Sequence, residues 1–287
     1  MNASKSNPDE NLPEFLSGSF LPSPPEIMQK IRIATPDLDQ IAKIINTDMG
    51  LCASVLKTIN SPFYGMKNTI VSIPQAVALL GLDSVMNIIN AHLLLTVLKS
   101  GDYASDLDDF WQLSNDTAET CVVVANYLDF PAADDIYLLG LFHNAGVPMM
   151  LKQFPEYMTT IHEAYEQSEI RITDVENNEY NCNHAVIGYI IAKGWQLPQE
   201  LRTIIRDHHN TDNLTNGLSE ERNANTMMVI LKIAEHISKT HLTLGKHEID
   251  HEWLKIKPSI LEYLGFSEPD FEELEDFVYD TMGLVTT

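Results

Sequence analysis

Apolar residues recur at intervals of three and four along most of the chain, which is the spacing of one helix face. Ile41, Ile44 and Ile45 follow this spacing behind Asp37 or Asp39, either of which can cap a helix. The same reasoning predicts helices from Asp48, Ser72 and Asp83, at about 110–128, 135–144, 155–167, 183–193, 199–208 and 224–240, and in PDFEELEDFVYDTM. No stretch alternates apolar and polar residues between two turns, as a half-buried strand does. The pattern predicts an all-α fold.

Charge narrows the range of partners. Acidic side chains outnumber basic ones by 41 to 18, a formal net charge of −23 at pH 7. Such a chain is repelled by nucleic-acid phosphates and by anionic lipid. We therefore expect neither nucleic acid nor a membrane surface as a partner, and expect a protein partner, a cation or a small ligand instead.

The cysteines and the apolar stretches indicate the compartment. Cys52, Cys121 and Cys182 are widely spaced among apolar neighbours and form no CxxC, so buried free thiols are expected. The polar start of the chain shows no secretory signal, and polar residues interrupt the apolar stretch 73–98. A cytoplasmic location is expected.

Several histidines and one glutamate occur at or near apolar helix faces. They are His143 in LLGLFHNAG, His184 in NCNHAVIGYII, His208 and His209 in IIRDHH, and Glu235 in VILKIAEHIS. Helical bundles assemble metal sites in this way, with one or two ligands from each helix. The alternative is a set of separately satisfied core histidines. On a helix, His208 and His209 would lie about 100° apart, so only one would face a shared site.

The order of these segments resembles a known family. GLFHNAG, NHAVIGYIIAKGWQLP, IIRDHH and LKIAEHI are similar to the HDOD domain, a branch of the HD superfamily. LPSPPEIMQKI, IAKIINTDMGLCASVLKTINSPFYG, SIPQAVALLGLDSV and DFWQLSNDTAETCVVVANYL resemble its earlier helices. The resemblance covers about residues 21–209 and continues more loosely to 237.

The resemblance implies a degenerate metal site. Catalytic HD enzymes hold divalent metals with a His, a His-Asp pair, further His residues and a closing Asp, and the metal activates water against a phosphate ester. Here His143 matches the histidine of the pair, but Asn144 replaces its aspartate and Leu113 stands near the first histidine position. Glu235 stands at the closing aspartate.

These changes remove ligands. Leucine offers no donor atom, and an amide offers only a neutral oxygen where a carboxylate would bridge two metals. A two-metal hydrolytic centre is therefore not expected, and no cofactor is required. A single Zn²⁺ on His143, His184, His208 and Glu235 remains compatible with the ligand types.

Two other motifs each allow a functional interpretation and one without function. Asn60 and Tyr64 of NSPFYG could mark a binding surface in the N-terminal lobe, but Asn-Ser-Pro also ends a helix through local side-chain to backbone bonds. The segment 247–251, HEIDH, matches the HExxH pattern of zinc proteases. Its polar surroundings give poor support for a buried catalytic helix, so the chance-match interpretation is favoured.

The organisation expected from the resemblance has four parts: a flexible leader over 1–20, an N-terminal helical lobe over 21–108, an HD-like lobe over 109–240 and a C-terminal helical extension over 241–287. The favoured function is a non-catalytic bacterial signal-transduction module that binds a protein partner or a small ligand. The alternatives are a metal-dependent phosphohydrolase acting on a nucleotide or phosphomonoester, and a structural partner of a response regulator.

Overall fold

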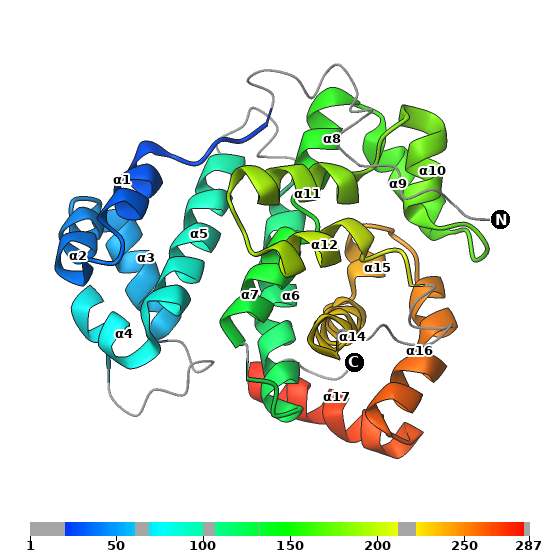
Figure 1. The fold of residues 1–287 in the computed structure, drawn as a ribbon. Coiled ribbons are helices and arrows are strands. Elements are labelled where there is room, and N and C mark those ends of the chain that lie inside the picture. Colours follow the sequence, from blue (N-terminus) through cyan, green and yellow to red (C-terminus); the bar gives the residue numbers. More distant parts are fainter. Residues whose placement is uncertain (1–20, 61–68, 100–106, 132, 212–221, 284–287) are drawn as a thin grey trace.

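The computed structural model describes residues 21–60, 69–99, 107–131, 133–211 and 222–283. Within these ranges the regular elements are helices and no strand occurs, so the predicted all-α fold is confirmed (Figure 1). Across the same residues, no helix is long and apolar enough to cross a membrane.

The first group of helices, blue to cyan in Figure 1, stands at one end of the molecule. Asp37, Asp48 and Ser72 each cap a helix by accepting a hydrogen bond from a backbone N–H three residues later. The elements are α1 (Glu26–Ala34), α2 (Leu38–Asn46), α3 (Met49–Ile59), α4 (Ile73–Leu80) and α5 (Leu82–Lys99). These caps are local, which is why the sequence predicted them.

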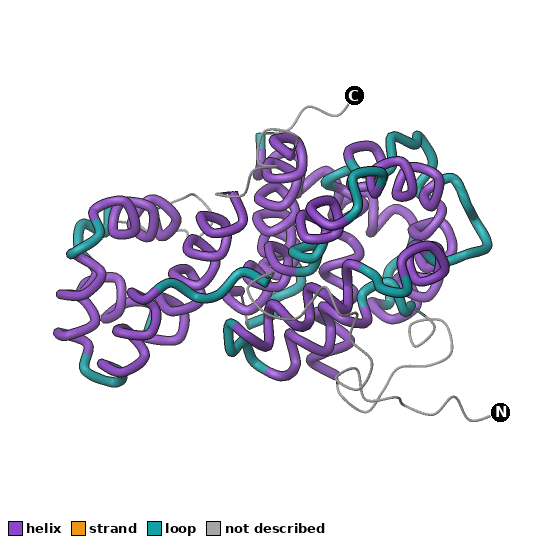
Figure 2. The backbone as a smooth tube through the Cα atoms, turned by 90° about the horizontal axis from the view of Figure 1, so that it is seen from above, coloured by secondary structure: helices purple, strands orange, loops and turns teal. Residues whose placement is uncertain are grey.

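The larger group of helices packs beside the first, as the view from above shows (Figure 2). Helices α6 and α7 pair along their lengths, α14 packs on both, and α5 contacts α7 from the other group. The elements are α6 (Asp108–Tyr127), α7 (Ala133–Phe142), α8 (Val147–Gln153), α9 (Tyr157–Tyr165), α10 (Ile172–Tyr180), α11 (His184–Gly194), α12 (Gln199–Asp207), α14 (Arg222–Ile237), α15 (Thr240–Thr243), α16 (His251–Leu264) and α17 (Glu268–Met282). The division into four parts stays a prediction.

Trp195, at the end of α11, connects the two groups. Its side chain is fully buried and meets Phe142 edge-on. Its indole Nε1 donates to the carbonyl of Pro22 at 2.8 Å. The guanidinium of Arg32 in α1 donates to the backbone carbonyl of Trp195 at 2.5 Å. This residue therefore anchors the start of the described chain to the second group.

The structure differs from the sequence-based expectation in two respects. Helices α8, α10 and α16 were not predicted, because α8 is only seven residues long and α10 and the start of α16 are rich in polar residues. Cys52 is half-buried and donates to Asn46 Oδ1, whereas Cys121 and Cys182 are buried free thiols as expected.

Candidate functional site

Four buried histidines, called here the histidine centre, meet inside the second group of helices. His143 follows α7, His184 is the first residue of α11, and His208 and His209 follow α12. The His208 ring lies 5.3 Å from that of His143, 5.2 Å from that of His184 and 4.2 Å from that of His209, centroid to centroid. Helices distant in sequence therefore bring their histidines to one point.

A glycine allows this convergence. A Cβ on Gly146 would lie 2.0 Å from the carbonyl oxygen of His184. No side chain fits in that space, so the turn that carries His143 can pack directly against the start of α11 only because residue 146 is glycine.

Each ring presents its Nδ1 to an acceptor. His143 Nδ1 lies 2.6 Å from the Gly140 carbonyl, and His208 Nδ1 lies 2.7 Å from that of Ile205. His184 Nδ1 lies 2.8 Å from Glu176 Oε2, and His209 Nδ1 lies 3.1 Å from Glu252 Oε2, so all four histidines have an acceptor at Nδ1. Such acceptors hold the proton on Nδ1 and leave the Nε2 lone pair for another partner.

The Nε2 atoms gather where a cation would fit. His184 Nε2 lies 3.3 Å from His208 Nε2, so two lone pairs face each other when both Nδ1 atoms carry the proton. One ligand nitrogen from each of His184, His208 and His209 lies within 4.8 Å of the others. Imidazole nitrogens supported by acceptors at Nδ1 are the ligand type that Zn²⁺ prefers.

A buried lysine occupies the other side of the site. Lys232 Nζ lies 2.8 Å from Glu235 Oε2 and 3.1 Å from Glu252 Oε2, and its side chain is 2% exposed. Glu235 Oε1 in turn lies 3.4 Å from His143 Nε2. In this group, called here the lysine–glutamate triad, the ammonium of Lys232 therefore compensates one of the two negative charges of Glu235 and Glu252 within the protein.

The environment shifts the pKa values in two directions. Burial lowers the pKa of His208 well below its ordinary value, and the neighbouring His209 and Lys232 lower it further. Burial also lowers the pKa of His209, against the opposing effect of Glu252. Burial opposes the charged forms of Lys232 and Glu235, but their attraction outweighs it, so the pKa of Lys232 is raised and that of Glu235 is lowered. These shifts favour the charged forms of Lys232, Glu235 and Glu252 and the neutral forms of His208 and His209.

The donor set fits one divalent ion and does not fit a two-metal hydrolytic centre. Asn144 and Leu113 are both buried, and neither supplies the anionic or imidazole donor that a catalytic centre needs. The Lys232 ammonium bonds to both nearby carboxylates and so compensates one of their two negative charges. His184, His208 and His209 are the residues that would hold a single ion.

The structure gathers the predicted site residues, with one change in grouping. His143, His184, His208 and Glu235 all border the same centre, but His209 joins the three-nitrogen group and His143 points toward Glu235. The expectation that only one of His208 and His209 faces the centre is wrong, because α12 ends at Asp207 and both residues lie beyond its regular turns.

The predicted N-lobe position Asn60 bonds to backbone on both sides of the segment that follows α3. Its Nδ2 donates to the carbonyls of Leu56 and Ile70 at 2.8 and 2.7 Å, and its Oδ1 accepts from Ile70 N at 2.7 Å. Tyr64 lies outside the described residues. A surface role for this pair stays a prediction.

Three residues of the site were missed in the sequence. Glu176 lies in the polar ITDVENNEY and Glu252 in the first turn of α16, so neither stands out. Lys232 did carry a signal, because it is a lone lysine in the apolar MMVILKIAEH, three residues before Glu235. Only the fold brings Glu252 to Lys232.

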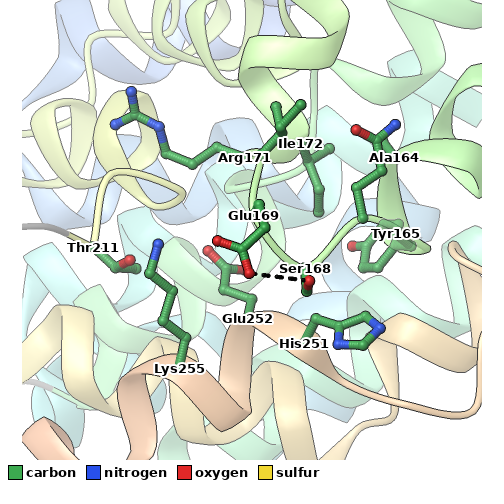
Figure 3. A pocket seen from close by; sticks show the side chains of 12 residues that line it. Ala164, Tyr165, Ser168, Glu169, Arg171, Ile172, Thr211, His251, Glu252 and Lys255 are labelled. Carbon is green, nitrogen blue, oxygen red and sulfur yellow. Dashed lines mark hydrogen bonds between the residues drawn. The ribbon is translucent and has the colours of Figure 1, made fainter.

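A surface pocket opens beside Glu252 (Figure 3). Arg171 and Lys255 extend over one side of it, and Glu169 and Glu252 lie between them and His251. Arg171 is braced by Asp174 at 2.9 Å and Asn210 at 3.0 Å. The pocket thus combines cationic and anionic groups next to the triad.

The all-helical fold and the buried centre of four histidines describe a helical domain with a potential metal-binding core. The family model for the HDOD domain matches residues 21–211. The chain belongs to the HDOD family.

Known proteins of this fold come from several bacteria. An uncharacterised protein of Treponema pallidum (strain Nichols) is 28% identical over 186 residues, which cover 64% of this chain and 36% of that protein. An HDOD domain protein of unknown function from Geobacter sulfurreducens is 23% identical with a TM-score of 0.63, covering 91% of this chain and 93% of that one. A proposed phosphohydrolase from Shewanella amazonensis is 19% identical with a TM-score of 0.62, covering 92% and 91%. At these identities the solved structures establish the fold alone.

Proposed function

We propose that this chain is a non-catalytic signal-transduction module that binds a small ligand or a protein partner through its HD-like part. The observation that carries the proposal is the lysine–glutamate triad. Lys232 supplies a built-in positive charge to Glu235, the acidic residue that would otherwise serve a metal. A divalent ion placed there would have to displace a buried ammonium held by two carboxylates.

The changes at other positions support the same conclusion. Asn144 and Leu113 are both buried, and the family resemblance places them at the positions of a metal-bridging carboxylate and an imidazole, neither of which they can supply. Binding requires none of these groups. The pocket of Figure 3, beside Glu252, offers Arg171 and Lys255 to an anionic part of a ligand.

The catalytic question is tested by assaying the full chain on nucleotides and phosphomonoesters with Mg²⁺, Mn²⁺ or Zn²⁺ added. His208→Gln serves as the matched control, because it removes one histidine of the centre. We expect wild type and variant to show the same background rate. Metal-dependent turnover that His208→Gln abolishes would contradict the proposal.

The binding question is tested by a thermal-shift screen of anionic metabolites. A ligand of the pocket should lose its stabilising effect in Lys255→Glu and keep it in Lys43→Glu, which makes the same charge change on exposed α2. If a ligand's effect is equal in both variants, it does not bind in this pocket.

One observation favours a second candidate, a metal-dependent phosphohydrolase. The nitrogens of His184, His208 and His209 converge, and each ring is supported at Nδ1. A single ion there could polarise a phosphate oxygen. The hydrolysis assay with the His208→Gln control separates the two candidates.

A further inference from the structure

A second polar cluster lies next to the lysine–glutamate triad, toward the C-terminal end of α14, and lines the same small cavity. It consists of His236 near the end of α14, His241 in α15 and Asp250 just before α16. One ligand atom from each lies within 4.8 Å of the others. These residues follow the segment matched by the family model, and the proposed function does not use them.

The two carboxylate oxygens of Asp250 have different partners. Oδ1 accepts from Trp253 N at 2.9 Å and caps α16. Oδ2 lies 2.9 Å from His236 Nδ1 and 3.4 Å from His241 Nδ1. Around a tetrahedral Zn²⁺, ligand atoms stand about 3.3 Å apart, given metal–nitrogen distances of about 2.0 Å. The spacing here is therefore close to that of a bound ion.

Two further polar atoms of this cluster are buried. His241 Nδ1 makes only the long 3.4 Å contact with Asp250 Oδ2, and Thr240 Oγ1 has no hydrogen-bond partner among the described residues, although buried polar groups are almost always paired. His241 is 7% exposed. Both residues line a small cavity together with His236 and Asp250, and Lys232, Glu235 and Glu252 line it from the side of the triad. Two imidazole nitrogens and a carboxylate oxygen that meet at the edge of a cavity form a donor set for a divalent ion.

The surroundings of His236 complete a ligand environment. Its ring stacks on Trp253 at 4.5 Å, with an angle of 12° between the planes, which fixes its orientation. Its Nε2 lies 3.9 Å from Glu275 Oε1 in α17. At this distance Glu275 is too far for a hydrogen bond and supplies only an electrostatic attraction to the far nitrogen of His236.

We propose that His236, His241 and Asp250 form a divalent transition-metal site that fastens α16 and α17 to the end of α14. Imidazole and carboxylate donors in this number favour Zn²⁺ over Mg²⁺ or Ca²⁺. The ion takes the two Nδ1 atoms and Oδ2, and a water bonded to Thr240 Oγ1 can complete the coordination. The role is structural, because the site joins three segments separated by turns.

The HExxH match acquires a different meaning in this context. α16 begins only at His251, so His247 and Glu248 lie before the helix, and His247 Nδ1 bonds to Ile249 within the same turn. The two histidines are therefore not presented on one helix face, as a zinc protease requires. The motif contributes through Asp250, which is not one of its zinc-binding positions.

The test measures Zn²⁺ binding to the chelator-treated full chain by native mass spectrometry and calorimetry. The variants are His241→Gln and Asp250→Asn, with His208→Gln as the control for the histidine centre. Asparagine keeps the cap on α16, so Asp250→Asn removes charge with little damage to the helix. We expect each of the first two variants to lose one Zn²⁺ or to bind it at least about 10-fold more weakly, and His208→Gln to keep it.

A second measurement works on the wild-type fold alone. Ni²⁺ or Cu²⁺ bound at His236 should quench the fluorescence of the stacked Trp253, and Trp253→Phe should remove the quenched component. Equal Zn²⁺ binding in wild type, His241→Gln and Asp250→Asn would overturn the proposal, as would metal binding that only His208→Gln removes. Absence of quenching at Trp253 would overturn it even if the variants failed to fold.

Discussion

Two polar clusters meet beside α14, and they balance their charges differently. In the first, the Lys232 ammonium lies between Glu235 and Glu252, and all four histidines have an acceptor at Nδ1. In the second, Asp250 Oδ2 faces the Nδ1 atoms of His236 and His241, while Lys232, which lines the same cavity, bonds to the two glutamates.

The difference teaches that resemblance to a metal-binding family does not by itself locate the metal. The first cluster has the family's residues, but part of its anionic charge is compensated by the protein. The second does not belong to the family's set of residues, and its carboxylate is paired with two imidazole nitrogens and not with an ammonium. A cation should therefore have a larger effect on the second cluster than on the glutamates of the first.

The largest effect is expected from Lys232→Met. It leaves Glu235 and Glu252 buried without their cation, which should cost about 3–5 kcal/mol of unfolding free energy in urea titrations. If the lysine stands in for a metal, added Zn²⁺ should recover part of this loss in the variant. A loss below about 1 kcal/mol would mean that the triad is not charged.

Glu176→Ala should have the next largest effect. Glu176 is fully buried and accepts from Tyr157 Oη, His184 N and His184 Nδ1. Removing it leaves these donors unpaired and should cost about 3 kcal/mol. Glu275→Ala, the equivalent change beside His236, should cost much less, because its contact is longer and half-exposed. Equal losses would remove this contrast between the clusters.

The pH dependence of stability tests the neutral histidines. In chelator, unfolded His208 and His209 take up protons near pH 6.5, whereas burial keeps the folded pKa values lower. The unfolded state therefore binds more protons below pH 6.5. Their contribution is fully present above pH 6.5 and is lost as the pH falls toward the folded pKa values, by about 1.4 kcal/mol per pH unit for each residue.

His208→Gln should reduce this slope by the contribution of one histidine. Denaturant titrations between pH 7 and 5 give the slope directly. A wild-type stability that stays constant across this range would show that the two histidines are not buried as neutral rings.

The smallest effect on stability is expected from variants of Asp250, which distinguish its role as the cap of α16 from its proposed role as a Zn²⁺ ligand. Asp250→Ala removes the cap of α16 and should cost about 1 kcal/mol in the metal-free protein, whereas Asp250→Asn should cost less than half of that. Both variants should lose the rise in Tm that Zn²⁺ gives to the wild type. A full Zn²⁺ response in Asp250→Asn would place the ion elsewhere.

Local rules predicted much of the fold. Asp37, Asp48 and Ser72 cap helices where the sequence placed them, because a cap depends only on residues three positions away. α10 was missed because ITDVENNEY has too few apolar residues to show a periodic face, and its position depends on packing against α9 and α11.

The candidate site was predictable in its members but not in its contacts. Histidines near apolar faces indicated that several helices could contribute to one centre. The direction of His209, the acceptor at each Nδ1 and the meeting of Lys232 with Glu252 depend on how α12, α14 and α16 pack. Sequence spacing does not contain that information.

The bond from Trp195 to Pro22 has a consequence for the order of folding. Its two partners are 173 positions apart, and the bond from Arg32 to the same residue spans 163. Contacts so distant in sequence carry a large loop-closure entropy and form late, whereas α1 to α5 can pack through near neighbours. During synthesis the first helices should therefore assemble before residue 195 leaves the ribosome, and docking of the two halves should be a separate, later step that Trp195→Phe slows.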